Sequence, residues 1–181
     1  NDRVNVTYSG YVAFDKALKT LDVASASDIR SYVAANQIDY AYDGGGDTNW
    51  QKEVLRTAIS HNHNLSINGG SQRTTYLASI SVNQRQGVVK GSDALRVNLR
   101  SLVSTKVLKD HLEISAGVNA MFGRFRGVPM GDEGGSVLDA MNYFNPTNPI
   151  RDEDGNWSKG SGSNNYNPLS LIYEDTSENQ W

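Results

Sequence analysis

The sequence predicts an all-β fold of antiparallel up-and-down strands, with short helices confined to the long connections. Between residues 61 and 125, four segments alternate polar and apolar residues with a strand's period of two. In chain order, the connections between strands are long, short, moderate, short and long. This inequality is typical of a transmembrane β-barrel, which has tight turns on one side and larger loops on the other. A soluble β-sandwich remains the alternative fold.

Strand alternation is clearest in the segment Leu112–Phe122. Its even-numbered residues are apolar, whereas Glu113, Ser115 and Asn119 share the opposite face. Four further segments have the same period. The five strands expected up to this point are Arg3–Phe14, His61–Gly69, Thr75–Asn83, Leu95–Arg100 and Leu112–Phe122.

The first long connection, about residues 15–60, is expected to contain two short helices. A Ser-x-x-Asp start at Ser25 and Asp28 begins a helix that runs up to Asn36. Apolar residues at helical spacing predict the other helix within residues 50–58. Between the two, Asp43-Gly-Gly-Gly-Asp-Thr48 is predicted to be a flexible breaker, because glycine permits many backbone conformations.

A second long connection covers about residues 123–166 and is rich in Gly, Asn, Ser and Asp. Loops of this length are commonly functional in compact domains. A sixth strand is expected to begin at Pro168–Ile172 and to continue through Ser177. Because strand-like patterns lie close to both ends of the sequence, we expect residues 1–181 to be a fragment of about six strands from a longer protein.

The composition excludes few classes of protein. The 181 residues carry a net charge of -3 and no cysteine. A mildly acidic chain without a basic cluster argues against a nucleic-acid partner. No apolar run approaches the roughly 20 residues of a membrane-spanning helix, although a barrel strand needs only about 9–11 residues with one apolar face.

Five runs in the chain resemble the SusC/RagA family of TonB-dependent outer-membrane transporters. They occur in the family's order and cover most of residues 49–172, while residues 1–35 fit its first strand and loop helix. The runs are 49–58 (NWQKEVLRTA), 61–70 (HNHNLSINGG), 86–93 (QGVVKGSD), 145–155 (NPTNPIRDEDG) and 167–171 (NPLSL).

This resemblance implies the N-terminal portion of a large barrel of about 22 strands in the bacterial outer membrane. Such a barrel is plugged by a separate domain and imports glycan or peptide oligomers with energy from the TonB system. Family members commonly pair with a SusD-like surface lipoprotein, which is therefore an expected partner, together with outer-membrane lipid. The plug and the TonB-interacting segment are expected outside this chain. The alternative function is that of a soluble carbohydrate-binding or adhesion module.

If Leu95, Val97 and Leu99 face lipid, their polar neighbours must face the barrel interior, since an Arg in contact with lipid at mid-membrane costs roughly 2–4 kcal/mol. These neighbours are predicted to contact the plug or to line the pore. The candidates are Arg96, Asn98, Arg100, Glu113 and Asn119.

Aromatic residues fall into two groups. Strand-end rings are expected to form a girdle at the lipid interface, namely Tyr11, Phe14, Phe122 and Phe125. Tyr143, Phe144 and Trp157 belong to the second long connection. They are candidates for contact with a ligand or a partner, and anchoring of the loop is the competing interpretation.

Metal sites and catalytic sites are not expected. His61 and His63 share a strand face but have no identifiable third ligand. The run Asp152-Glu-Asp-Gly-Asn156 has calcium-type oxygen ligands, but Trp157 replaces the glycine that a calcium loop requires. A looser calcium site that also uses Asp132 or Glu133 is the one cofactor left open. No nucleophile motif, triad or convergent carboxylate pair is found, so we expect no enzyme and no catalytic residues.

Overall fold

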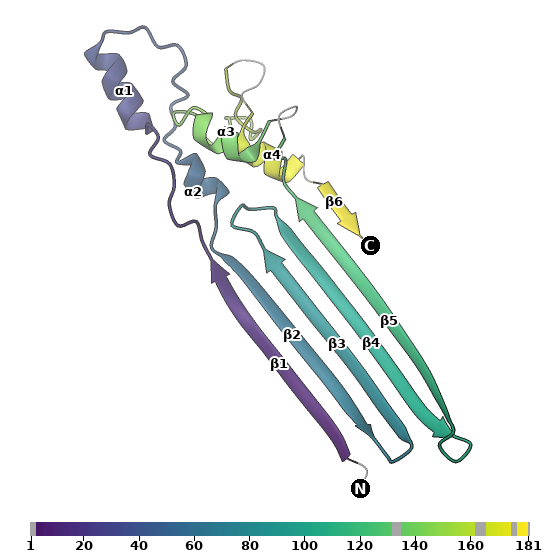
Figure 1. Cartoon of the computed structure of the whole chain (residues 1–181). Coiled ribbons are helices and arrows are strands. Elements are labelled where there is room, and N and C mark those ends of the chain that lie inside the picture. Colours follow the sequence, from purple (N-terminus) through teal and green to yellow (C-terminus); the bar gives the residue numbers. More distant parts are fainter. Residues whose placement is uncertain (1–2, 132–134, 162–165, 175–176, 181) are drawn as a thin grey trace.

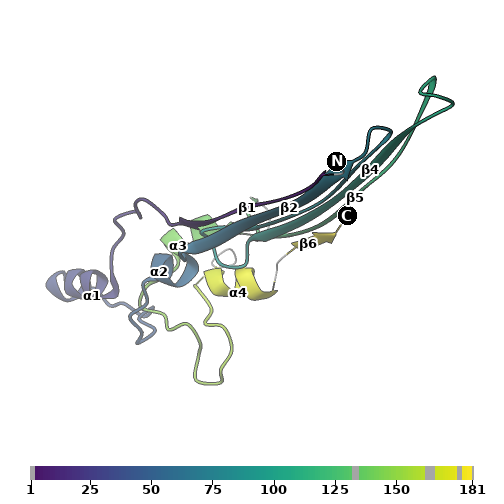
Figure 2. The same ribbon diagram turned by 90° about the horizontal axis from the view of Figure 1, so that it is seen from below.

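The computed structural model describes residues 3–131, 135–161, 166–174 and 177–180. Its centre is one twisted antiparallel sheet in which every strand pairs with its neighbour in sequence, in the order β1-β2-β3-β4-β5-β6 (Figures 1 and 2). This confirms the all-β up-and-down prediction, and the described residues form one sheet rather than the two packed sheets of a β-sandwich. The strands are β1 Arg3–Asp15, β2 Ala58–Gly70, β3 Thr74–Gln86, β4 Asp93–Val107, β5 Leu112–Gly127 and β6 Ser177–Gln180.

Long and short connections lie at opposite ends of the sheet (Figure 1). Two tight turns, β2–β3 and β4–β5, lie at the end where the N-terminus is found. The β4–β5 turn contains three successive residues with positive φ, Leu108, Lys109 and Asp110. The other end carries the helices and both long connections, so the predicted one-sided inequality is present in the structure.

Register assigns every strand residue to one of two faces, because directly opposed residues of antiparallel strands project to the same side. The apolar face carries Val4, Val6, Val12, Leu65, Ile67, Ile80, Val82, Leu95, Val97, Leu99, Ile114, Val118 and Phe122. The polar face carries Asn62, Asn64, Ser66, Ser79, Ser81, Arg96, Asn98, Arg100, Glu113, Ser115 and Asn119.

The same register corrects half of the expected aromatic girdle. Phe14 opposes Ile59 and Phe122 opposes Val97, so both rings lie on the apolar face. Tyr11 and Phe125, in contrast, oppose Asn62 and Ala94 on the polar face. A position near a strand end is thus not sufficient, because strand parity decides which face a ring occupies.

Four helices form in the described parts of the long connections. Two were predicted: α1 Ala26–Ala35, whose Ser25 and Asp28 form the expected capping box, and the shorter α2 Trp50–Val54. The other two are α3 Val137–Tyr143 and α4 Pro168–Glu174. Within the described residues, no helix combines the length and apolar character needed to cross a membrane.

Helix α4 replaces the strand that was predicted to start at Pro168. The Asn167 side chain accepts a hydrogen bond from the Leu169 amide at 2.9 Å, and Pro168 stands at the first helical position, where its fixed φ suits a helix. Leu171 and Ile172 are buried against the other helices. The sixth strand begins only at Ser177 and pairs with the last residues of β5.

Candidate wall and loop head

The predicted interior-facing residues lie on the polar face of β4 and β5. Arg100 directly opposes Asn119, and Glu113 opposes Lys106 further toward the tight-turn end. Arg96 and Asn98 occupy the same face at the next positions toward the long connections. All five candidates therefore lie on the face opposite to the apolar face. They are spread along the strands and do not form one cluster.

The apolar face has the height of a membrane barrel wall. The ten residue steps from Leu112 to Phe122 carry apolar residues on this face without interruption. At about 3.3 Å per residue and a strand tilt near 45°, ten steps span roughly 23 Å, close to the ~25 Å apolar band of such barrels. The next residue of this face is Arg124, which marks the end of the band on the side of the long connections.

Beyond the sheet, residues of α2, α3 and α4 enclose a small hydrophobic core, which we call the loop head. Trp50 from α2 is 3% exposed and packs edge-on against Phe144, with 4.9 Å between ring centroids. The other buried members are Val54, Val137, Leu169, Leu171 and Ile172. The two long connections thus fold on one another and share a single core.

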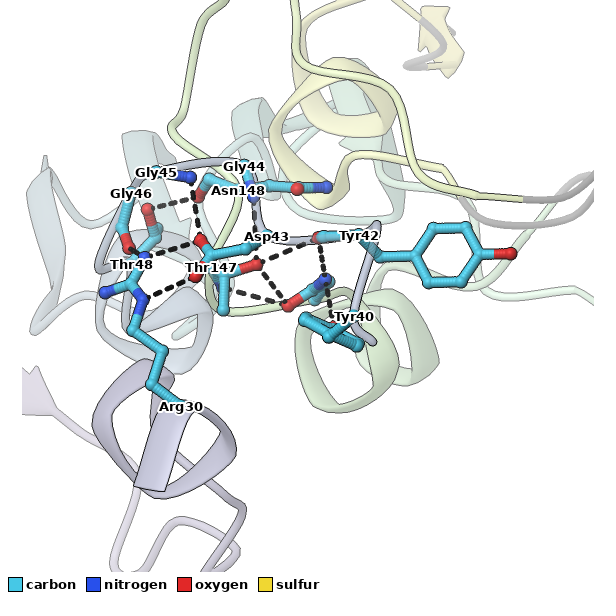
Figure 3. Close-up of polar contacts among 11 residues, drawn as sticks. Arg30, Tyr40, Tyr42, Asp43, Gly44, Gly45, Gly46, Thr48, Thr147 and Asn148 are labelled. Atoms are coloured by element: carbon cyan, nitrogen blue, oxygen red, sulfur yellow. Dashed lines mark hydrogen bonds and ion pairs between the residues drawn. The ribbon is translucent and has the colours of Figure 1, made fainter. Parts of the chain in front are cut away.

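A second contact between the two connections, the clasp, joins residues 40–48 to residues 145–149 (Figure 3). It contains main-chain hydrogen bonds between segments about a hundred positions apart in the sequence. These bonds run from the Gly46 amide to the Thr147 carbonyl (2.6 Å) and from the Thr48 amide to the Pro146 carbonyl (2.9 Å).

Asn145 is the polar centre of the clasp. Its side-chain amide donates to the Tyr42 carbonyl and to the Tyr40 hydroxyl, both at 2.9 Å. Its carbonyl accepts a hydrogen bond from the Trp50 indole at 3.0 Å. One asparagine therefore links the clasp to the core of the loop head.

Residues 43–48, which were predicted to be a flexible breaker, instead pack closely against residues 147–149. A Cβ atom on Gly46 would lie 2.6 Å from the Pro149 nitrogen, and one on Gly44 would lie 2.6 Å from the Asn148 side-chain oxygen. Both glycines are required for close approach of two chains, whereas Gly45, at φ +75°, supplies the turn.

Arg30 ties α1 to the clasp. Its guanidinium donates two hydrogen bonds to the Asp43 carboxylate, each 2.7 Å, and a third to the Gly46 carbonyl at 2.8 Å. The side-chain bond from Arg30, followed by the Gly45 amide, lowers the pKa of Asp43 to about 2.

We expect this tie to weaken in acid. The folded pKa of Asp43 lies below its ordinary value of 3.8, so its contribution is complete above about pH 4 and is lost as the pH falls to about 2. Thermal unfolding of the wild type and Asp43→Asn should differ at neutral pH and converge near pH 2. Asp39→Asn is the control on the same connection. A difference that persists unchanged at pH 2 would contradict the assignment.

The run around Asp152 forms a turn by its own hydrogen bonds. One carboxylate oxygen of Asp152 accepts bonds from the amides of Asp154 (3.1 Å) and Asn156 (2.8 Å). Arg151 and Trp157 pair across this turn, with the guanidinium 3.8 Å from the centre of the indole ring. Local turn chemistry thus accounts for Asp152.

The three aromatic loop candidates have different surroundings. Phe144 is 2% exposed inside the loop head, and Tyr143 beside it is 81% exposed. Trp157 stacks on Tyr173 with 5.8 Å between centroids and borders a polar cleft of about 690 Å³. Tyr143 is therefore accessible to a ligand or partner and Phe144 anchors the loop in this chain, whereas Trp157 is half-buried and packs against the core of the loop head.

Two of the candidate metal ligands, His61 and His63, lie side by side. His61 and His63 lie with ring centroids 5.2 Å apart on the apolar face, and no group of three His, Cys, Asp or Glu side chains suited to a metal is found in the described part of the chain. Asp132 and Glu133, considered for a looser calcium site, lie outside the described residues.

Sequence comparison links this architecture to known receptors. No protein-family model matches the chain. It is 33% identical over 150 residues to the TonB-dependent receptor SusC of Bacteroides thetaiotaomicron, an alignment that covers 81% of this chain and 14% of that receptor. It is 29% identical over 167 residues to the TonB-dependent receptor P3 of Formosa agariphila, covering 88% of this chain and 16% of P3.

The chain thus spans about one seventh of the length of these relatives. Receptors like SusC are outer-membrane proteins, which agrees with a sheet that has one apolar face of membrane height. Over the residues that it spans, this chain is a SusC-like segment of the TonB-dependent receptor family of the bacterial outer membrane.

Proposed function

We propose that this segment forms wall strands and surface loops of an importer that moves glycan or peptide oligomers across the outer membrane with energy from the TonB system. The observation that carries the proposal is the two-faced wall in a chain that is 33% identical to SusC. In this arrangement the apolar face meets lipid, and Arg96, Arg100 and Glu113 on the polar face line the pore or contact a plug.

The surface loops support a role in binding at the outer side. Both long connections leave the sheet at one end and share the loop head, which presents exposed Tyr143 and the cleft beside Trp157. A SusD-like lipoprotein is the proposed partner for this surface. Glycans and peptides both offer groups that stack on aromatic rings and hydrogen-bond to polar loops, so both substrate classes are retained.

Uptake measurements test the proposal. A strain that lacks the complete receptor should lose uptake of one class of fluorescent probe from a panel of oligosaccharides and oligopeptides. Complementation with the receptor gene should restore that uptake, and a strain without functional TonB should lack it. Uptake of every probe at the wild-type rate in the deletion strain would overturn the proposal. Co-purification of a surface lipoprotein with the tagged receptor tests the partner separately.

A further inference from the structure

The apolar face is not uniformly covered by side chains. A hollow of about 440 Å³ lies across β2, β3, β4 and β5 on this face. Its side-chain lining is almost entirely apolar. Ser79 and Arg100 also border it, but the register directs their side chains to the opposite face, leaving them as main-chain neighbours.

Small residues create the hollow. Ala78, Ser101 and Ala120 lie on adjacent strands, and their short side chains leave space above the sheet unfilled. Larger side chains flank them, including Leu65 and Leu99. Because β-strand side chains stand roughly perpendicular to the sheet, small residues between large ones leave a depression that water would have to fill or an apolar group could occupy.

Register also gives the position of the hollow between the two ends of the sheet. It covers two adjacent rows of opposed residues, one through Leu65 and Ala120 and one through Ala78 and Ser101. The row through Leu65 and Ala120 is the one nearer the long connections. Two rows beyond it in that direction, the same face carries the polar residues His61, Gln84 and Arg124.

Two polar side chains, Tyr8 and His63, extend from the row of the hollow toward that edge. The Tyr8 side chain lies in the row of Leu65, and its hydroxyl is 2.7 Å from Nδ1 of His63, one row higher. Gly10, opposite His63, leaves the space that these side chains fill, since a Cβ there would lie 3.0 Å from the Tyr8 hydroxyl. A tyrosine whose hydroxyl points toward a polar boundary behaves as residues do near a membrane interface.

From these features we propose that the hollow binds one acyl chain of a lipid in the outer leaflet. Its position below the polar edge at His61 and Arg124, on the side of the surface loops, corresponds to the outer half of the membrane. The occupant is hydrocarbon, because the hollow offers no charged side chain and only the Ser101 hydroxyl for a polar group. The hollow is also continuous with the surface that is proposed to face lipid.

The inference rests on the proposed orientation of the wall, and a matched pair of alanines allows it to be tested separately. Ala120 lines the hollow, whereas Ala116, on the same strand and the same face, lies outside it. The complete receptor in phospholipid nanodiscs is irradiated with a phospholipid that carries a diazirine midway along one acyl chain. Mass spectrometry then locates the adducts.

In the wild type, adducts should concentrate on residues 78–80, 99–101 and 118–120. Ala120→Phe fills the hollow and should abolish this concentration, whereas Ala116→Phe should retain it. Circular dichroism checks that both variants fold. Adducts spread evenly over the apolar face, or equal patterns in the two variants, would overturn the acyl-chain site while leaving the wall orientation intact.

Two other outcomes would point elsewhere. Adducts that reach the hollow in nanodiscs holding one receptor copy but are absent there in nanodiscs holding two would replace the lipid with a second copy as its occupant. An absence of adducts from the whole apolar face would refute the orientation of the wall, and with it the inference. The uptake experiment does not depend on either result, so failure of the site and failure of the importer proposal are distinguishable.

Discussion

Replacing Trp50 with alanine should destabilise the loop head by about 3–5 kcal/mol, the usual cost of removing a large aromatic side chain from a core. Trp50 is 3% exposed, packs edge-on against Phe144 and donates its indole hydrogen bond to the Asn145 carbonyl. The variant should therefore lose both core packing and the link to the clasp. Amide hydrogen exchange of α2, α3 and α4 in the complete receptor measures the loss.

Trp50→Phe separates the two contributions. It keeps an aromatic ring in the core but removes the indole donor, so the expected cost from the hydrogen bond is only about 1 kcal/mol, with a further cost from the smaller ring. Amides in β2 and β3 should keep their protection in both variants, because those strands do not contact the loop head core. Equal loss of protection throughout the sheet would show that the loop head is not a separate stability unit.

Placing a lysine at Leu99 should cost up to roughly 2–4 kcal/mol, because a charge on the lipid-facing side of a barrel strand inside the apolar band is desolvated, with the largest cost at the midplane. Leu99 lies on the apolar face between Ile80 and Ala120. The free energy of unfolding of the receptor in phospholipid vesicles, obtained from urea titration, measures the effect.

The neighbouring residue provides the control. Asn98→Lys introduces the same charge one position away on the polar face, where a polar interior tolerates it. We expect Asn98→Lys to change the free energy of unfolding far less than Leu99→Lys. If the two substitutions cost the same, or if their order is reversed, the proposed orientation of the wall is wrong.

The strands could be predicted from the sequence because their signal is local. Alternation with period two identified five strands, and the parity of Leu112 and Glu113 already separated the two faces. The aromatic residues near the strand ends were less well assigned. Tyr11 and Phe125 were grouped by their distance from a strand end, although their odd numbers place them on the polar face.

Two helices were missed despite local signals in the sequence. Asn167-Pro168 is a cap followed by a proline at the first helical position, which outweighs the short apolar run that was interpreted as a strand. Helix α3 begins at Val137 after the N-cap residue Ser136, and the Asp139 amide donates to the Ser136 hydroxyl at 3.4 Å. This is the same Ser-x-x-Asp spacing that predicted α1.

The clasp had no comparable local signal. Asn145 and Tyr40 are 105 positions apart, and neither residue by itself specifies the other as its partner. The three glycines were predicted to be flexible because glycine usually provides conformational freedom. At Gly46 its function is the absence of a side chain, and only knowledge of the opposing Pro149 shows this.

The distance in sequence across the clasp has a consequence for the order of folding. Thr48 and Asn148 are hydrogen-bonded although a hundred positions separate them, and closing so long a loop directly is slow because of its entropy. Strands β2 to β5 shorten this path, since each hairpin returns the chain to the same end of the sheet. We therefore expect the hairpins to pair first and the clasp to close last, so that the surface loops acquire their shape only after the wall beneath them exists.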